Sequence, residues 1–134
     1  MIVFDTSAAI DFLRGGLKVR SIVEQIEQKG EVASITVISQ YEPLAPVCHK
    51  QLRDEERNVR SFLRRAKVPN LDADSAEKAS RIMGALFKLG TPVNALDTLI
   101  AGIAIANRAD SIATRDRDFV IISKVPEIAK MLIP

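Results

Sequence analysis

The feature that most constrains the fold is the alternation of short apolar runs with segments of helical periodicity. Residues 2–4 (Ile-Val-Phe) are apolar and partly β-branched, as in a buried strand of a parallel sheet, and they end at Asp5. The apolar residues within 8–13 then predict a helix, which Thr6 or Ser7 can cap. The chain therefore begins with a strand, an acidic residue and a helix.

The same alternation continues along the chain. Further helices are predicted over residues 19–26, from Thr36 onward, over 75–89 and 95–107, and after Pro126 with Ile128, Met131 and Leu132 on the inner side. Strands are predicted over residues 31–34, 111–114 and 119–122. We expect a helix start or a break between Tyr41 and Pro46, because proline disrupts a helix interior. This alternation indicates an α/β fold with a mostly parallel central sheet, and 134 residues indicate a single domain over 1–134.

Composition excludes several kinds of catalytic chemistry. The chain has one His and one Cys, so it cannot build a zinc site from three or four such ligands or use two histidines as acid and base. A Ser-His-Asp triad would have to use His49. If the protein is an enzyme, its reactive groups come mostly from the 17 Asp and Glu side chains.

Three observations predict a cytoplasmic protein that does not enter a membrane. A single Cys forms no internal disulfide, which is consistent with a reducing compartment. Residue 5 is already Asp, so a basic segment followed by an apolar run, as in a signal peptide, is not expected. The longest apolar run, residues 99–106, is much shorter than the roughly 20 residues that span a bilayer.

Four acidic residues are candidates for the chemistry because of their places in the predicted elements. Asp5 and Asp116 follow predicted strands, and the carboxyl ends of strands in an α/β sheet border the ligand crevice. Asp97 lies in the first turn of an otherwise apolar helix, where a buried carboxylate is costly unless it is paired or binds a cation. Stabilisation of the helix dipole is the alternative explanation of Asp97. Glu42 lies beside apolar neighbours and could equally be a solvated helix residue.

A cluster of these four acids would need a cation or protonation. Two carboxylates about 4 Å apart repel each other by roughly 4 kcal/mol at an effective dielectric constant of about 20. Oxygen ligands without His or Cys select Mg²⁺ or Mn²⁺ over softer metals. Such ions can activate water and stabilise the attacking and leaving oxygens of a displacement at phosphorus. A phosphodiester is the substrate that fits this chemistry.

Four segments resemble, in order, the motifs of PIN-domain proteins. The opening, Ile2-Val-Phe-Asp-Thr-Ser-Ala-Ala-Ile-Asp11, is similar to the first motif, and Thr36-Val-Ile-Ser-Gln-Tyr-Glu42 is similar to the second. Leu96-Asp-Thr-Leu-Ile-Ala-Gly-Ile-Ala-Ile105 resembles the third motif, and Thr114-Arg-Asp-Arg-Asp-Phe119 resembles the fourth. The resemblance covers practically the whole chain and implies a three-layer α/β/α fold. Within the family it is nearest to the VapC-type toxins of toxin–antitoxin modules.

The resemblance implies a Mg²⁺-dependent endoribonuclease site, in which metal-activated water attacks an RNA phosphodiester. Its metal ligands and catalytic residues would be Asp5, Glu42, Asp97 and Asp116, with Asp118 instead of or beside Asp116. Thr6, Ser7 and Thr114 match the small polar residues that support the acids. Pro43 departs from the family, which usually has an aliphatic residue after the second acid, and so leaves the orientation of Glu42 open. The family also implies a cognate VapB-type antitoxin and a homodimer.

A row of basic residues is a candidate RNA-binding surface. The row is Lys50, Arg53, Arg57, Arg60, Arg64 and Lys67, and its spacing would place all of it on one face of a single helix. In the RNA-binding hypothesis, phosphates are held by Arg57, Arg60 and Arg64, with Arg115 as a further candidate. The alternative is a solvated face that the nearby acids in 54–56 partly neutralise. Arg115 and Arg117 flank the fourth acid and could contact phosphate or only balance the charges of Asp116 and Asp118.

Three other functions are alternatives to a toxin endoribonuclease. A phosphatase that works through an aspartyl-phosphate would need a second Asp two residues after the first, but that residue is Ser7. A PIN-family nuclease could act in RNA maturation instead of toxicity. A PIN-like protein could also bind RNA or a protein without cleaving, although the presence of all four acids favours cleavage.

Overall fold

The computed structural model describes residues 1–129 and 132–133. Its strands are β1 (Ile2–Phe4), β2 (Ala33–Ile35), β3 (Ser111–Ala113) and β4 (Leu132–Ile133). Its helices are α1 (Thr6–Leu13), α2 (Leu17–Gln28), α3 (Val37–Lys50), α4 (Arg53–Arg65), α5 (Ala73–Lys88), α6 (Ala95–Ala106), α7 (Asp118–Ile122) and α8 (Pro126–Ala129). Among the described residues, no helix has the length and apolar character needed to cross a lipid bilayer.

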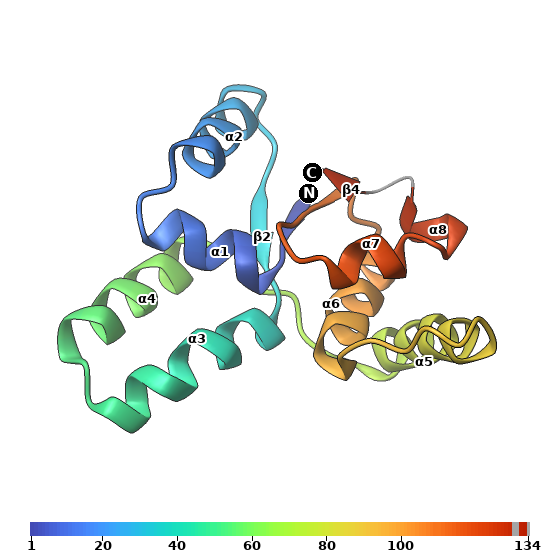
Figure 1. Ribbon diagram of the computed structural model, residues 1–134. Helices are drawn as coiled ribbons and strands as arrows, with labels where there is room; N and C mark the ends of the chain where they lie inside the picture. Colours follow the sequence, from blue (N-terminus) through green and yellow to red (C-terminus); the bar gives the residue numbers. More distant parts are fainter. Residues whose placement is uncertain (130–131, 134) are drawn as a thin grey trace.

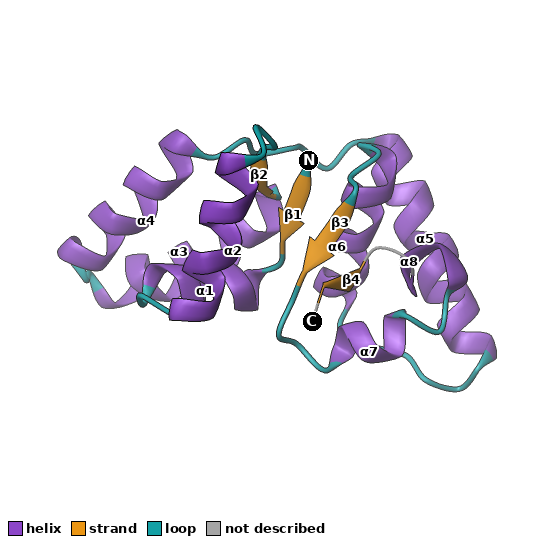
Figure 2. Cartoon of the chain, turned by 90° about the horizontal axis from the view of Figure 1, so that it is seen from above, coloured by secondary structure: helices purple, strands orange, loops and turns teal. Residues whose placement is uncertain are grey.

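The four strands form one parallel sheet in the order β2-β1-β3-β4. In the ribbon, α1 to α4 lie on one side of this sheet and α5 to α8 on the other (Figures 1 and 2). All strands run in the same direction, so their carboxyl ends meet at one edge. Asp5, Thr36 and Thr114 each follow a strand at that edge. The predicted three-layer α/β/α arrangement with a parallel central sheet is confirmed.

Alternation along the strands builds two separate cores. Ile2 and Phe4 point to one face, where they pack with buried residues of α1 and α2 and with half-buried residues of α4. Val3 and Ile112 point to the other face and pack against α5, α6 and α7. Helix α6 has seven buried residues among its 12 and contributes to this second core, as its apolar sequence predicted.

The segment 119–122 is a helix and not the predicted strand. Phe119 and Ile122 are fully buried, whereas Val120 between them is 67% exposed. Burial therefore repeats every three residues, as in a helix, and not every two, as in a strand. A short β-branched run carries both patterns, and periodicity alone cannot separate them.

Three smaller expectations about helices were also wrong. Helix α3 runs without interruption through Pro43 and Pro46, so no start or break lies between Tyr41 and Pro46. Asp5, and not Thr6 or Ser7, caps α1. The last helix ends at residue 129, so Leu132 belongs to β4 instead, and Met131 lies outside the described residues.

The proposed single basic helix is divided into two helices. Gln51 adopts a left-handed backbone conformation with φ of 54°, and it separates α3 from α4. Lys50 therefore ends α3, and Lys67 lies beyond α4. The row that remains on α4 consists of Arg53, Arg57, Arg60 and Arg64.

Candidate active site

Asp5 is 1% exposed and is held by three donors at the carboxyl end of β1. Its Oδ1 accepts hydrogen bonds from the backbone N–H of Ala8 at 2.9 Å and from Ser7 Oγ at 2.7 Å. Its Oδ2 accepts a hydrogen bond from Thr114 Oγ1. The side chain is held here because Asp5 directly follows β1 and is also the N-cap of α1.

A second group of acids comes from α6, from the loop before α7 and from the first residue of α7. Carboxylate oxygens of Asp97, Asp116 and Asp118 all lie within 4.8 Å of one another. Asp97 comes from the first turn of α6 and is 7% exposed. The side chain of Asp116 stabilises the turn into α7, since its Oδ1 accepts a hydrogen bond from the N–H of Asp118 at 2.9 Å. We call these three residues the acidic cluster.

Glu42 reaches the site from α3 and is anchored to α1. Thr6 Oγ1 donates to Glu42 Oε1 at 2.5 Å, and the same hydroxyl lies 3.0 Å from Ser39 Oγ. The negative charge of Glu42 is one of the causes that raise the pKa of Asp97. Glu42 is thus close enough to interact with the acidic cluster, although Pro43 follows it directly.

The pKa values show the cost of bringing these acids together. Burial raises the pKa of Asp97 to about 7, and the charges of Asp116, Asp118 and Glu42 and a hydrogen bond with Asp118 contribute to the rise. Burial also raises the pKa of Asp5 above its usual value, with a smaller contribution from Asp116, although three hydrogen bonds oppose the rise. Closely spaced carboxylates that offer only oxygen ligands fit a hard divalent cation.

Polar residues connect Asp5 to the loop that carries Asp116. Thr114 Oγ1 donates to Asp5 and accepts from the N–H of Asp116 at 3.0 Å. Ser7 Oγ donates to Asp5 and accepts from the N–H of Arg115 at 3.0 Å. The structure therefore brings together all the predicted acids and the supporting residues Thr6, Ser7 and Thr114.

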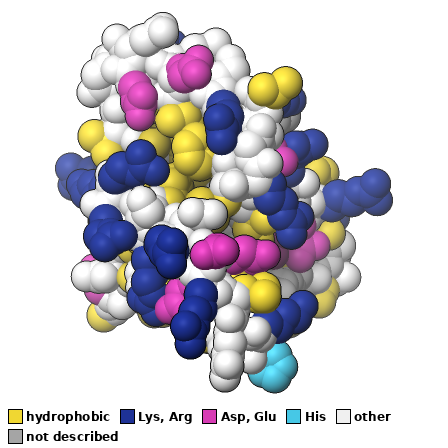
Figure 3. All heavy atoms as spheres, turned by 90° about the vertical axis from the view of Figure 1, so that its left-hand side faces the viewer, with side chains coloured by type: hydrophobic (Ala, Val, Ile, Leu, Met, Phe, Trp, Pro, Cys, Tyr) yellow, Lys and Arg dark blue, Asp and Glu magenta, His cyan; other side chains and the backbone are white. Residues whose placement is uncertain are grey.

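Three of the arginines predicted to bind RNA form ion pairs with carboxylates outside the acidic cluster. Arg57 and Arg60 form ion pairs with acids of their own helix, and Arg115 pairs with Asp11 at 2.8 Å. Within the described residues, no hydrogen bond or ion pair links α4 to the acidic cluster. Figure 3 shows Lys and Arg side chains spread around a short row of Asp and Glu side chains on the side of the molecule that carries α1 to α4.

Two residues of the network were missed in the sequence. Ser39 contacts Thr6, and Asp11 holds Arg115. Helical spacing is the signal that could have found them, because residues three or four apart share a helix face. Ser39 precedes Glu42 by three residues, and Asp11 follows Ser7 by four.

Known proteins share this architecture. Residues 2–125 match the family model of the PIN domain. No curated protein matched the sequence. Among solved structures, the chain is similar to one of VapBC2 from Rickettsia felis bound to a DNA fragment from their promoter, with a TM-score of 0.84 and 20% identity over 99% of this chain and 98% of that chain.

Two further structures are similar at comparable identity. VapBC-1 from nontypeable Haemophilus influenzae matches with a TM-score of 0.81 and 18% identity, over 99% of this chain and 97% of that chain. DNA-bound VapBC from Salmonella typhimurium matches with a TM-score of 0.75 and 23% identity, over 98% and 96%. The shared fold and the family match over residues 2–125 together show that the chain belongs to the PIN domain family.

Proposed function

We propose that this protein is a Mg²⁺-dependent endoribonuclease and the toxin of a VapBC-type toxin–antitoxin module. The observation that carries the proposal is the acidic cluster, in which three carboxylates lie within 4.8 Å beside Asp5 and Glu42. Like charges at this spacing need a cation or a proton, and the donor set contains only oxygen. PIN-domain proteins are a family of nucleases, which supports phosphodiester hydrolysis.

The residues fit a divalent cation through their chemistry. Asp97, Asp116 and Asp118 would hold it, with Asp5 and Glu42 completing the acidic set. When bound, Mg²⁺ or Mn²⁺ supplies the charge that activates water and stabilises a displacement at phosphorus. Asp118 is therefore proposed beside Asp116 and not in place of it, because both carboxylates face Asp97.

The polar network orients the acids before any substrate binds. Ser7, Thr114 and the N–H of Ala8 fix both oxygens of Asp5. Thr6 holds Glu42 in place, so Pro43 does not turn that carboxylate away from the site. Such supporting contacts fix the direction of ligand oxygens and tune a metal site.

The toxin role is supported by the fold. Several of the similar solved structures are of VapBC proteins, and another is described as a toxin–antitoxin complex from Klebsiella pneumoniae. We propose by analogy that a VapB-type antitoxin binds this chain, that the chain is cytoplasmic, and that it forms a homodimer. Light scattering of the purified chain tests the homodimer directly.

The nuclease activity is tested with a matched pair of variants. Asp97→Asn should abolish RNA cleavage in Mg²⁺ or Mn²⁺, because it removes a ligand from the acidic cluster. Asp74→Asn is the control, since Asp74 is also in the first turn of a helix but is exposed and pairs with Lys78. EDTA should stop cleavage by the wild type. Cleavage that survives in both Asp97→Asn and Asp5→Asn would rule out the proposed site.

Growth experiments separate toxicity from the alternatives. Expression of the wild-type chain should arrest growth, the Asp97→Asn variant should not, and co-expression of a cognate antitoxin should restore growth. RNA cleavage without growth arrest would favour a role in RNA maturation. Binding of RNA without metal-dependent cleavage would favour a non-cleaving PIN protein.

A further inference from the structure

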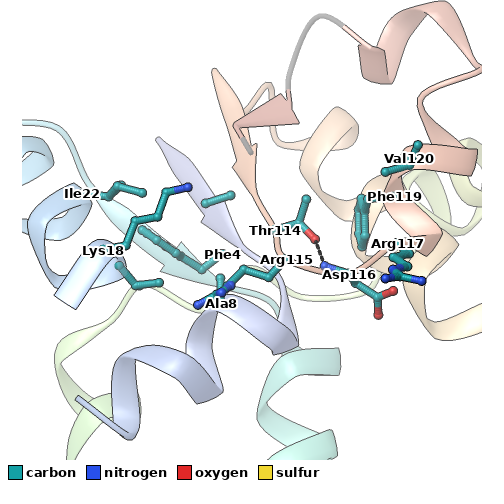
Figure 4. A pocket seen from close by; sticks show the side chains of 12 residues that line it. Phe4, Ala8, Lys18, Ile22, Thr114, Arg115, Asp116, Arg117, Phe119 and Val120 are labelled. Carbon is teal, nitrogen blue, oxygen red and sulfur yellow. Dashed lines mark hydrogen bonds between the residues drawn. The ribbon is translucent and has the colours of Figure 1, made fainter. Parts of the chain in front are cut away.

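A cavity of about 480 Å³ lies beside the acidic cluster, at the carboxyl ends of β1 and β3 (Figure 4). Lys18 and Ile22 of α2 lie on one side of it, and Phe119 and Val120 of α7 lie on the other. The loop from β3 to α7 passes between these two sides and contributes Asp116 to the lining. The cavity and the acidic cluster therefore share a residue.

The inside of the cavity is apolar. Buried side chains of Phe4, Ala8 and Val19 line it. Val120 contributes an aliphatic side chain that is 67% exposed. Ligand sites of about 300–1,000 Å³ typically combine an apolar lining with a few polar groups at defined places. The volume and lining suit a flat ring system that would cover Val120.

The polar groups of this cavity are mainly cationic. Lys18, Arg115 and Arg117 line it, with Asp116 as the one acid. Arg115 is already paired with Asp11. Across residues 1–129, no ion pair holds Lys18 or Arg117. Two unpaired cations beside an apolar cavity complement a ligand that has both a ring and a phosphate.

We propose that this cavity binds the base of one nucleotide next to the scissile phosphodiester, and that Lys18 and Arg117 bind the phosphates adjoining that nucleotide. The inference rests on the proposed function, because it takes the substrate to be RNA. An apolar side chain of an antitoxin is the other occupant that the lining would accept. The unpaired cations favour a polyanion, since phosphate contacts dominate the affinity of nucleic-acid complexes.

Titration of the isotopically labelled protein with each of the four nucleoside 5′-monophosphates tests the site by NMR. Ribose 5-phosphate is the base-free control, and EDTA keeps trace metal from drawing the phosphate to the acidic cluster. At least one nucleotide should shift the amide signals of Lys18 and Val120 and bind about tenfold more tightly than ribose 5-phosphate. Val120→Asp should weaken this binding about tenfold. Val32→Asp, at an exposed valine outside the cavity, should not.

Kinetics with an RNA substrate provide an independent readout. Lys18→Ala should raise KM several-fold with little change in kcat, because it removes a phosphate contact remote from the reacting atoms. Lys29→Ala, at the other end of α2, is the matched control. Both variants change exposed residues, so the fold should persist.

The outcomes distinguish this site from the proposed function. If nucleotides bind no better than ribose 5-phosphate, or bind Val120→Asp as well as the wild type, the base-binding site is wrong even when the protein cleaves RNA. If nucleotides bind as expected but the wild type cleaves no RNA in any metal, the site stands and the nuclease function falls. If Val120→Asp loses only antitoxin binding, the cavity belongs to the antitoxin and the proposal is overturned.

Discussion

Asp97 is subject to two opposing effects that differ in size. Its place in the first turn of α6 favours the ionised form through the helix dipole, by about 0.3–1 kcal/mol. Burial and the neighbouring acids favour the protonated form and raise its pKa from 3.8 to about 7. A shift of this size corresponds to a few kcal/mol, so burial and repulsion dominate. Helix stabilisation therefore does not explain why this helix carries an acid.

The raised pKa predicts how stability depends on pH in the metal-free protein. Folded Asp97 binds its proton more tightly than unfolded Asp97, so proton binding stabilises the folded state. This contribution to the free energy of unfolding is fully present below about pH 4 and is lost as pH rises through about 7. Asp97→Asn should remove this loss and raise the melting temperature at pH 8 in EDTA. Thermal unfolding between pH 4 and 8, followed by circular dichroism, measures the effect. An unchanged pH slope in Asp97→Asn, with Asp74→Asn as the control, would contradict it.

The hydroxyl group of Thr114 is expected to be important for activity. Its hydroxyl is the link between Asp5 and the backbone of Asp116. Thr114→Val should lower metal-dependent RNA cleavage about 10- to 100-fold, as is typical when a contact that orients a ligand is lost. Thr114→Ser should retain most activity because it keeps the hydroxyl. Thr91→Val is the matched control, since Thr91 Oγ1 is buried and has no hydrogen-bond partner among the described residues.

The packing of α5 against α6 depends on one glycine. A Cβ at Gly102 would lie 2.4 Å from the carbonyl oxygen of Ser75 and 2.7 Å from the backbone nitrogen of Ala79. Both are backbone atoms, which cannot move aside without shifting α5. Gly102→Ala should therefore destabilise the protein by about 1–3 kcal/mol, as measured by urea unfolding.

Gly84 is the control for that experiment. It lies within α5, and a Cβ there would meet nothing within 4 Å. Gly84→Ala should stabilise the protein by about 0.5–1 kcal/mol through helix propensity. Equal effects of the two substitutions would show that Gly102 is not needed for close packing.

The basic row on α4 is expected to contribute less to RNA binding than its sequence suggested. Arg57 pairs with Asp54, and Arg60 pairs with Glu56. Of the three α4 arginines proposed to bind RNA, only Arg64 has no carboxylate partner among the described residues. Replacing all three arginines with Ala should reduce the slope of log affinity against log salt by about one, not by about three. Filter binding of RNA in EDTA measures the slope, and Arg81→Ala on α5 is the control. An unchanged slope would exclude α4 from RNA binding.

Elements were predictable where one periodicity dominated. Helix α6 followed from a long apolar run, and in the structure Asn94 caps it. Helix α7 did not, because a run of four apolar residues, three of them β-branched, suits a strand and a helix equally and only tertiary packing decides. The prolines of α3 misled for a similar reason. Ile38 and Val47 of that helix are buried, and burial against other elements is not visible in the local sequence.

The site depends on the order of the strands in the sheet. Strand β1 lies between β2 and β3, so Asp5 from the start of the chain meets Thr114 from its last third. The positions of Asp5 and Asp116 after predicted strands suggested one edge of a parallel sheet, and at that edge Thr114 links the two residues. The facing of Asp118 toward Asp97 could not be predicted, because it follows from the turn that begins α7.

Metal binding should be visible in the stability of the whole molecule. A ligand that binds only the folded state stabilises it by about 2.7 kcal/mol at a concentration of 100 times its Kd. Protons compete with a cation for the acidic cluster, and the pKa of Asp97 near 7 means that this competition acts between about pH 5 and 7. Saturating Mg²⁺ should therefore raise the melting temperature clearly at pH 8 and much less at pH 5. Asp97→Asn should lose most of the increase at pH 8, whereas an equal increase at both pH values, or in both proteins, would place the cation elsewhere.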